Sequence, residues 1–170
     1  MTNRAIAALA MLAIFAAVVG FQVTQRASAQ SPAKKPIDFA LKNTAGKTVK
    51  LFDYRGKVVV VDVWATWCPY CVEEIPGLVS LQADALKNKT PLQLIGISVD
   101  DDRDAVKDFI KKQPMNYPVV YADSAQMKPF GDIDAYPTKF IINKDGEIVD
   151  KIIGALSRKE LEDTLAKYLN

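Results

Sequence analysis

Two cysteines, Cys68 and Cys71, directly follow an apolar run, and this arrangement constrains the fold more than any other feature of the sequence. The run over residues 57–63 is typical of a strand buried in a sheet, and the residues from Pro69 onward are typical of a helix start. The free amides and positive end of that helix would stabilise a thiolate at Cys68. The sequence therefore predicts a dithiol redox centre at a strand–helix junction.

The same pair could instead bind a metal or form a structural disulfide. A structural zinc site needs about four Cys or His ligands, and the chain has no further cysteine and no histidine. A structural disulfide gains most from closing a long loop, and this loop is very short. Two reduced thiolates could still hold a soft cation such as Cu(I). We therefore predict redox chemistry with no metal site and no cofactor, and keep a Cu(I)-binding module as the alternative from a different class.

The N-terminal residues 1–29 differ in composition from the rest of the chain. Asn3 and Arg4 precede an apolar, alanine-rich run over residues 5–21, and Ala27-Ser28-Ala29 offers an A-x-A cleavage site. This pattern predicts a bacterial export signal that is cleaved or kept as an uncleaved anchor. A linker is expected at residues 30–36 and one domain at residues 37–170. We expect that domain in the periplasm, tethered to the inner membrane only if the signal is retained.

The formal net charge of +2 comes from the predicted signal, because Arg4 and Arg26 are its only charged side chains. The remaining chain has equal numbers of basic and acidic residues, and they are interspersed as on an ordinary solvated surface. The sequence therefore predicts no nucleic-acid partner.

Strand and helix patterns alternate along the predicted domain. Hairpins are expected at residues 37–51 and 138–153, the second around the turn at residues 143–146. Buried strands are expected at residues 58–63 and 92–99, a short strand at 117–121, and helices after Cys71, from Asp101, at 125–130 and after a capping box of Ser157 and Glu160. This order predicts an α/β fold with helices packed on a mixed sheet.

Several separated motifs together resemble thioredoxin-fold proteins, and more narrowly the exported thiol–disulfide oxidoreductases of the TlpA/ResA type within the redoxin, or AhpC/TSA-related, superfamily. The motifs are Ile37–Leu41, Gly46–Val49, Asp53–Lys57, Trp64–Cys71, Tyr136–Thr138 and Ile153–Ala155. The resemblance implies a thioredoxin-like fold: a central mixed β-sheet flanked by helices, with an N-terminal β-hairpin and an inserted strand–helix segment.

The resemblance also implies roles for the residues around the dithiol. Cys68 would be the exposed attacking cysteine and Cys71 the more buried resolving one. Pro137 would lie in a cis-proline loop that faces the dithiol, where Tyr136 offers its backbone to a substrate peptide. The substrate-binding set implied by the family is Trp67, Pro69, Tyr70, Tyr136, Pro137 and Thr138.

Two acidic residues near the cysteines are candidate catalytic residues, and Asp62 is the candidate proton acceptor. Asp62 interrupts the valine run of the buried strand, and burial would raise its pKa. It matches the buried acid of thioredoxin, proposed to deprotonate the resolving thiol, although many TlpA-like chains have Asn there. Glu74 shares a helical face with Cys71 and matches a glutamate of ResA-type proteins. The alternatives are a solvent-accessible acid at a strand edge for Asp62 and a charge that favours the helix start for Glu74.

The sequence therefore predicts an exported reductant of protein disulfides. If both acids are ionised near the thiols, they disfavour the thiolate and make the dithiol a better electron donor. By resemblance, the substrate could be apocytochrome c during cytochrome c maturation, and the electron donor a membrane thiol relay. A disulfide oxidase or isomerase is the alternative. A peroxiredoxin-like peroxidase is disfavoured because Thr66 lies two residues before Cys68, whereas that motif needs three.

Overall fold

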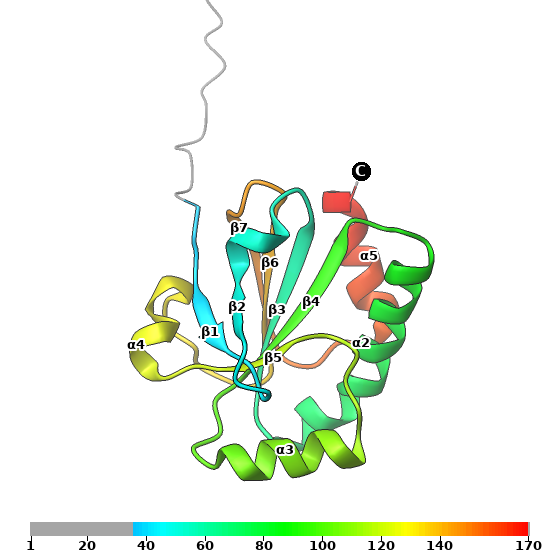
Figure 1. Cartoon of the computed structure of the whole chain (residues 1–170). Helices are drawn as coiled ribbons and strands as arrows, with labels where there is room; N and C mark the ends of the chain where they lie inside the picture. Colours follow the sequence, from blue (N-terminus) through cyan, green and yellow to red (C-terminus); the bar gives the residue numbers. More distant parts are fainter. Residues whose placement is uncertain (1–35, 170) are drawn as a thin grey trace, which may run out of the picture. The chain divides into compact units, whose positions relative to one another are not determined.

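The computed structural model describes residues 36–169, in which strands and helices alternate (Figure 1). The strands are β1 Ala40–Lys42, β2 Thr48–Lys50, β3 Val58–Trp64, β4 Leu92–Ser98, β5 Val119–Tyr121, β6 Thr138–Ile142 and β7 Ile148–Ile153. The helices are α2 Pro69–Lys87, α3 Arg103–Lys112, α4 Ser124–Met127 and α5 Arg158–Leu169, with 3-10 turns η1 Leu51–Tyr54 and η2 Lys128–Phe130. The predicted export signal, and all of the predicted linker except Pro36, lie outside the described residues. Within residues 36–169, no helix is long and apolar enough to cross a membrane.

Five strands form a mixed sheet in the order β5-β4-β3-β6-β7. Strands β3, β4 and β5 are parallel, whereas β6 is antiparallel to β3 and β7 is antiparallel to β6. Every residue of the central strand β3 is buried, because both faces of the sheet are covered. The hairpin β1–β2 forms a separate antiparallel pair, and β5 with α4 forms a strand–helix segment between α3 and β6. The predicted α/β architecture is confirmed.

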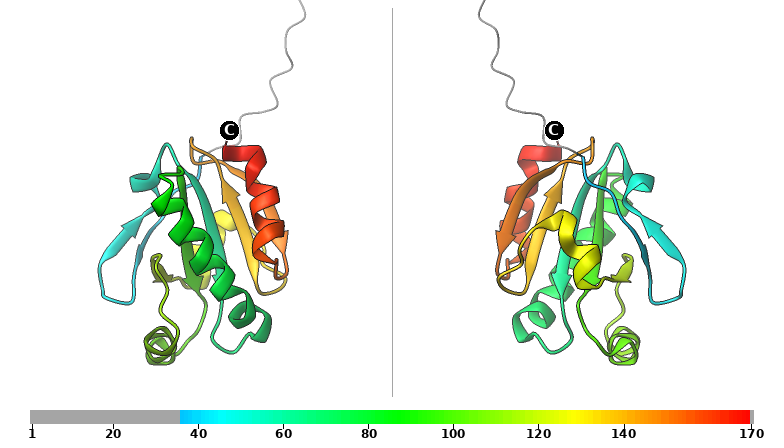
Figure 2. Two further views of the ribbon diagram at one scale, coloured as in Figure 1. Left: turned by 90° about the vertical axis from the view of Figure 1, so that its right-hand side faces the viewer. Right: turned by 90° about the vertical axis from the view of Figure 1, so that its left-hand side faces the viewer.

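The two faces of the sheet are covered by different elements (Figure 2). On one face, α2 and α5 pack Leu78, Leu81 and Leu161 against Val60 and other buried side chains of the sheet. On the opposite face, the hairpin and the α4–η2 segment cover a second cluster that includes the alternate residues of β3. A continuous apolar run can be buried on both faces in this way, which is why β3 carries so many valines.

The turn between β6 and β7 forms where the sequence predicts it. The side chain of Asn143 accepts hydrogen bonds from the backbone amides of Asp145 and Glu147 at 3.1 and 2.9 Å. Gly146 has φ +86°, a backbone conformation that favours glycine, and a Cβ there would also displace the guanidinium of Arg55. The predicted capping box of α5 is also present, since Ser157 and Glu160 each accept a hydrogen bond from the other's backbone amide.

Candidate active site

Cys68 and Cys71 form a disulfide at the N-terminus of α2. Cys68 is the N-cap residue, and its Sγ accepts a hydrogen bond from the Cys71 amide at 3.2 Å. Pro69 follows as the first helical residue, where its missing amide hydrogen costs nothing. When the disulfide is reduced, the same amide and the positive end of the helix favour a thiolate at Cys68.

Cys68 is less exposed than the resemblance implies. Its exposed fraction is 5%, and that of Cys71 is 0%. The bond to Cys71 folds the sulfur of Cys68 back over the helix end, and both cysteines pack in one cluster with Trp64 and Ile75. The expectation of an openly exposed attacking cysteine is therefore wrong for the oxidised protein, although Cys68 remains the more accessible of the two.

Asp100 holds the loop that leads into the dithiol, a role that the sequence does not predict. Its carboxylate accepts hydrogen bonds from the Thr66 amide at 3.1 Å and the Thr66 hydroxyl at 2.6 Å. It also accepts one from the Ser98 hydroxyl at 2.9 Å. Because β3 and β4 are adjacent and parallel, their C-terminal ends meet at this edge of the sheet. Asp100 thus fastens the loop before Cys68 to the end of β4.

The loop before β6 lies beside the dithiol. The peptide bond between Tyr136 and Pro137 is cis, as the resemblance implies. Tyr136 packs against the cluster that contains both cysteines, and its ring meets Trp67 edge-on at 5.8 Å between centroids. Trp67 is 63% exposed, which leaves most of its ring free for a substrate.

The remaining predicted substrate-binding residues fall into two groups. Pro69 and Tyr70, which lie between the two cysteines at the N-terminus of α2, are both exposed. Thr138 is fully buried instead, and its hydroxyl donates to the Ala135 carbonyl at 2.7 Å. Its side chain therefore stabilises the loop, and its role in substrate binding stays a prediction. Gly154 supports the same loop by donating from its amide to the Pro137 carbonyl at 2.8 Å.

A buried charged cluster lies between the sheet and α2. Asp62 of β3 is directly opposite Lys139 of β6 in the antiparallel pairing, so their side chains share a face of the sheet. The ammonium of Lys139 lies 3.6 Å from Asp62 Oδ1 and donates a hydrogen bond to Glu74 Oε1 at 2.6 Å. The side chains of Lys139, Asp62 and Glu74 are 0%, 1% and 2% exposed. Both predicted acids are therefore buried and share one cation.

Burial raises the pKa of both carboxyl groups, as expected for Asp62. The pKa of Glu74 is raised to about 7 by burial and by the neighbouring Asp62, against the opposing effect of Lys139. The pKa of the buried Tyr117 lies well above its usual value, because of burial and then the charges of Asp62 and Glu74. The prediction for two ionised acids near the thiols did not include a cation, and Lys139 supplies a positive charge that both acids share.

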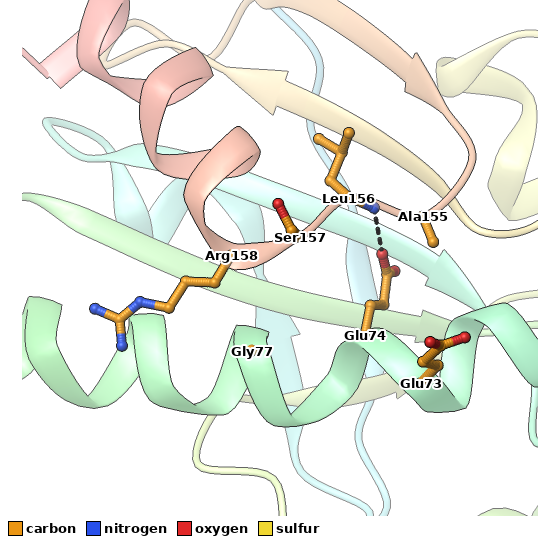
Figure 3. A pocket seen from close by; sticks show the side chains of 7 residues that line it. All are labelled: Glu73, Glu74, Gly77, Ala155, Leu156, Ser157 and Arg158. Carbon is orange, nitrogen blue, oxygen red and sulfur yellow. Dashed lines mark hydrogen bonds between the residues drawn. The ribbon is translucent and has the colours of Figure 1, made fainter.

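Glu74 connects this cluster with the surface. Its Oε2 accepts a hydrogen bond from the Leu156 amide at 3.1 Å, as the dashed line in Figure 3 shows. Glu74 and Leu156 line an open cavity of about 310 Å³ between α2 and the start of α5, together with Glu73, Gly77, Ala155, Ser157 and Arg158. One carboxylate oxygen of Glu74 thus faces Lys139, and the other faces the cavity wall.

One signal in the sequence could have revealed Lys139. It is the single charged residue in the β6 run Thr138–Ile142, just as Asp62 is in β3. Two opposite charges in two buried strands suggest a pair, but their register comes only from the fold.

Among residues 36–169, no group of three or more His, Cys, Asp or Glu side chains could hold a metal ion.

Known proteins are similar to this chain over most of its length. The model of the AhpC/TSA family matches residues 32–151. The thiol-disulfide oxidoreductase ResA of Bacillus cereus is 31% identical over 169 residues, which cover 97% of this chain and 96% of that protein. ResA of Bacillus subtilis is 31% identical over 133 residues, covering 78% of this chain and 71% of that protein. A crystal structure of a thiol:disulfide interchange protein of the thioredoxin family from Chlorobium tepidum matches with a TM-score of 0.75 at 28% identity, covering 84% of this chain and 100% of that one. The predicted thioredoxin-like fold is thereby confirmed.

Proposed function

Because the chain belongs to the AhpC/TSA family and is a thiol–disulfide oxidoreductase, we propose that it reduces disulfides of exported proteins through Cys68 and Cys71. Either direction of exchange uses the same two sulfurs. What we propose is therefore the direction of the exchange, the compartment in which it takes place and the partner proteins.

In the proposed cycle, the Cys68 thiolate attacks one sulfur of the substrate disulfide. A bond forms between Cys68 and that sulfur, and the other substrate sulfur leaves as a thiolate. Cys71 then loses its proton and attacks Cys68 Sγ, which releases the second substrate thiolate and forms the Cys68–Cys71 disulfide. Two electrons pass to the substrate. Asp62 and Glu74 are the proposed acceptors of the Cys71 proton, because Glu74 lies one turn beyond Cys71 on α2 and shares Lys139 with Asp62.

The observation that carries the reductive direction is the charge balance beneath the dithiol. Two buried carboxyl groups share a single ammonium, so the cluster gains negative charge as Glu74 ionises near pH 7. Negative charge gained there opposes a thiolate, and a dithiol with a poorly stabilised thiolate gives up its electrons more readily. The residues between the cysteines, Pro69 and Tyr70, add no cation that would reverse this balance. Lys139 offsets part of the negative charge of the cluster, but the charge still becomes more negative when Glu74 ionises.

The test is the reduction potential of the Cys68–Cys71 couple in the domain starting at Gln30, equilibrated against glutathione or dithiothreitol. A potential near that of thioredoxin, about −270 mV, supports a reductase. A potential near the strongly oxidising end, about −120 mV, would replace it with the second candidate, a disulfide oxidase or isomerase.

The proposed compartment is supported by the N-terminal sequence, and the proposed partners by the resemblance to TlpA/ResA-type proteins. Residues 1–29 have the pattern of an export signal, which supports a periplasmic location, either free or tethered to the inner membrane. Apocytochrome c is the proposed substrate, and a membrane thiol relay is the proposed electron donor. The mass of the protein, measured in both the periplasmic and the membrane fractions, would distinguish a cleaved signal from an anchor. Loss of covalently bound haem on deletion of the gene would support the substrate.

A further inference from the structure

Lys139 is the buried group whose function the dithiol mechanism leaves open. Its side chain is 0% exposed, yet it carries a charge in the middle of the sheet. Within the described residues its ammonium has three polar neighbours: Glu74 Oε1 at 2.6 Å, the Gly154 carbonyl at 3.4 Å and Asp62 Oδ1 at 3.6 Å. A fully buried lysine is uncommon unless it is paired, and this one is paired with both candidate proton acceptors.

The fold places these three side chains under the resolving cysteine. Asp62 and Trp64 lie on the same face of β3, because they are two residues apart in a strand. Trp64 packs in one cluster with Cys71, which lies one helical turn before Glu74. Lys139 thus touches both acids on the side of the sheet that carries Cys71.

We propose that Lys139 is a positioning residue for the resolving step: its shared ammonium keeps one carboxylate of the Asp62–Glu74 pair ionised at neutral pH, ready to accept the Cys71 proton. The inference rests on the proposed exchange reaction but on neither of its directions. In this step the Cys71 S–H bond breaks and its proton passes to a carboxylate. The resulting thiolate bonds to Cys68 Sγ, and the substrate sulfur leaves with the electron pair of the broken S–S bond.

The charges around the cluster support this assignment. The titratable groups of the cluster are Asp62 from β3, Glu74 from α2 and Lys139 from β6, and the charges of the two acids also act on Tyr117 from the segment before β5. Burial raises the pKa of each acid, the charge of Asp62 raises the pKa of Glu74 further, and Lys139 is the cation that lowers both pKa values. The segment before α5 adds the Gly154 carbonyl, which accepts a hydrogen bond from Lys139, and the Leu156 amide, which donates one to Glu74. Lys139 is therefore the side chain in this cluster that favours the ionised form of both acids.

The geometry also gives the transferred proton a way out. Glu74 Oε1 faces Lys139, while Oε2 meets the Leu156 amide at the cavity of Figure 3. A proton accepted inside the cluster can therefore reach solvent through Glu74 without crossing the dithiol.

The test compares Lys139→Met and Lys139→Gln with the parent domain. Each reduced protein reacts with a small aromatic disulfide, and the slower release of the second chromophore reports resolution by Cys71. We expect the pH midpoint of this phase to rise by roughly one to three units in both variants, because an opposite charge at this range shifts a pKa by that amount. Lys151→Met, which removes an exposed lysine from the neighbouring strand β7, should leave the midpoint unchanged.

Infrared spectra of the oxidised proteins provide a readout that does not depend on activity. Both Lys139 variants should show more protonated carboxyl absorbance than the parent at neutral pH. In an Asp62→Asn/Glu74→Gln background, adding Lys139→Met should shift the midpoint no further. Because the assay substrate is a small molecule, an oxidising potential would refute the proposed direction without affecting this result.

Three outcomes would overturn the assignment. A parental midpoint in a folded Lys139→Met protein would mean that the lysine only fills space. A parental midpoint in Lys139→Gln would mean that a neutral donor is sufficient. If neither variant folds, the parent itself decides: two protonated buried carboxyl groups at pH 7 would contradict the proposal.

Discussion

Replacing Glu74 with glutamine should remove a pH dependence of stability that this one carboxyl group causes. Its pKa rises on folding from an ordinary 4.5 to about 7, mainly through burial. Each unit is worth about 1.36 kcal/mol, so the shift corresponds to about 3 kcal/mol of unfolding free energy. The side chain is 2% exposed, which leaves little room for solvent screening.

The direction of the pH dependence of the unfolding free energy follows from which state, folded or unfolded, keeps the proton on Glu74. Between pH 4.5 and about 7, the folded protein keeps a proton on Glu74 that the unfolded chain has already lost. The stabilisation from this group is therefore complete below the unfolded pKa and disappears as the pH rises through the folded pKa. Asp62 acts in the same direction, since its pKa is also raised by burial. Glutamine at position 74 cannot titrate, so its contribution stays constant over the same range.

The measurement is urea unfolding of the oxidised domain at closely spaced pH values, with the Cys68–Cys71 disulfide intact. The difference in unfolding free energy between the parent and Glu74→Gln should change by about 3 kcal/mol across the window. Glu73→Gln is the matched control, because it removes an exposed carboxylate from the same helical turn. It should follow the parent curve. A difference that stays flat to within about 1 kcal/mol would refute the raised pKa and the reasoning built on it.

Three further changes test other parts of the structure. Gly154→Ala should cost about 1–3 kcal/mol of unfolding free energy, because the residue has φ +100°; an unchanged urea midpoint would contradict this strain. Leu161→Ala should cost about 2–5 kcal/mol, because it opens a cavity under α5; calorimetry that finds less than about 1 kcal/mol would show that the site collapses. Trp67→Ala should change stability by less than about 1 kcal/mol, because the ring is largely exposed, yet raise KM for a peptide disulfide; an unchanged KM would remove Trp67 from the substrate surface.

Local patterns explain why much of the fold could be predicted. The turn at Asn143–Gly146 and the cap at Ser157 involve residues close together in the chain, so the sequence itself carries their geometry. The same holds for Cys68, because an N-cap position and the amide of Cys71 lie within one helical turn. The identity of the reactive sulfurs needed no tertiary information.

Contacts between distant segments could not be predicted in this way. Asp100 binds Thr66 only because β3 and β4 lie in parallel register, and no local pattern at residue 100 specifies that neighbour. The burial of Cys68 in the oxidised protein likewise depends on the cluster around Trp64. The full burial of Thr138 also depends on the fold, because β6 is paired with both β3 and β7.

The sequence by itself determined the dithiol, the strand and helix that hold it, and the presence of acids nearby. The tertiary structure decided the electrostatic environment of those acids. Pairing of β3 with β6 brings Lys139 opposite Asp62, and packing of α2 on the sheet adds Glu74 to the same ammonium. Electrostatic energy depends on distance and burial, and both are properties of the folded chain. The protonation states of Asp62 and Glu74 therefore depend on contacts between β3, β6 and α2, which are far apart in the sequence.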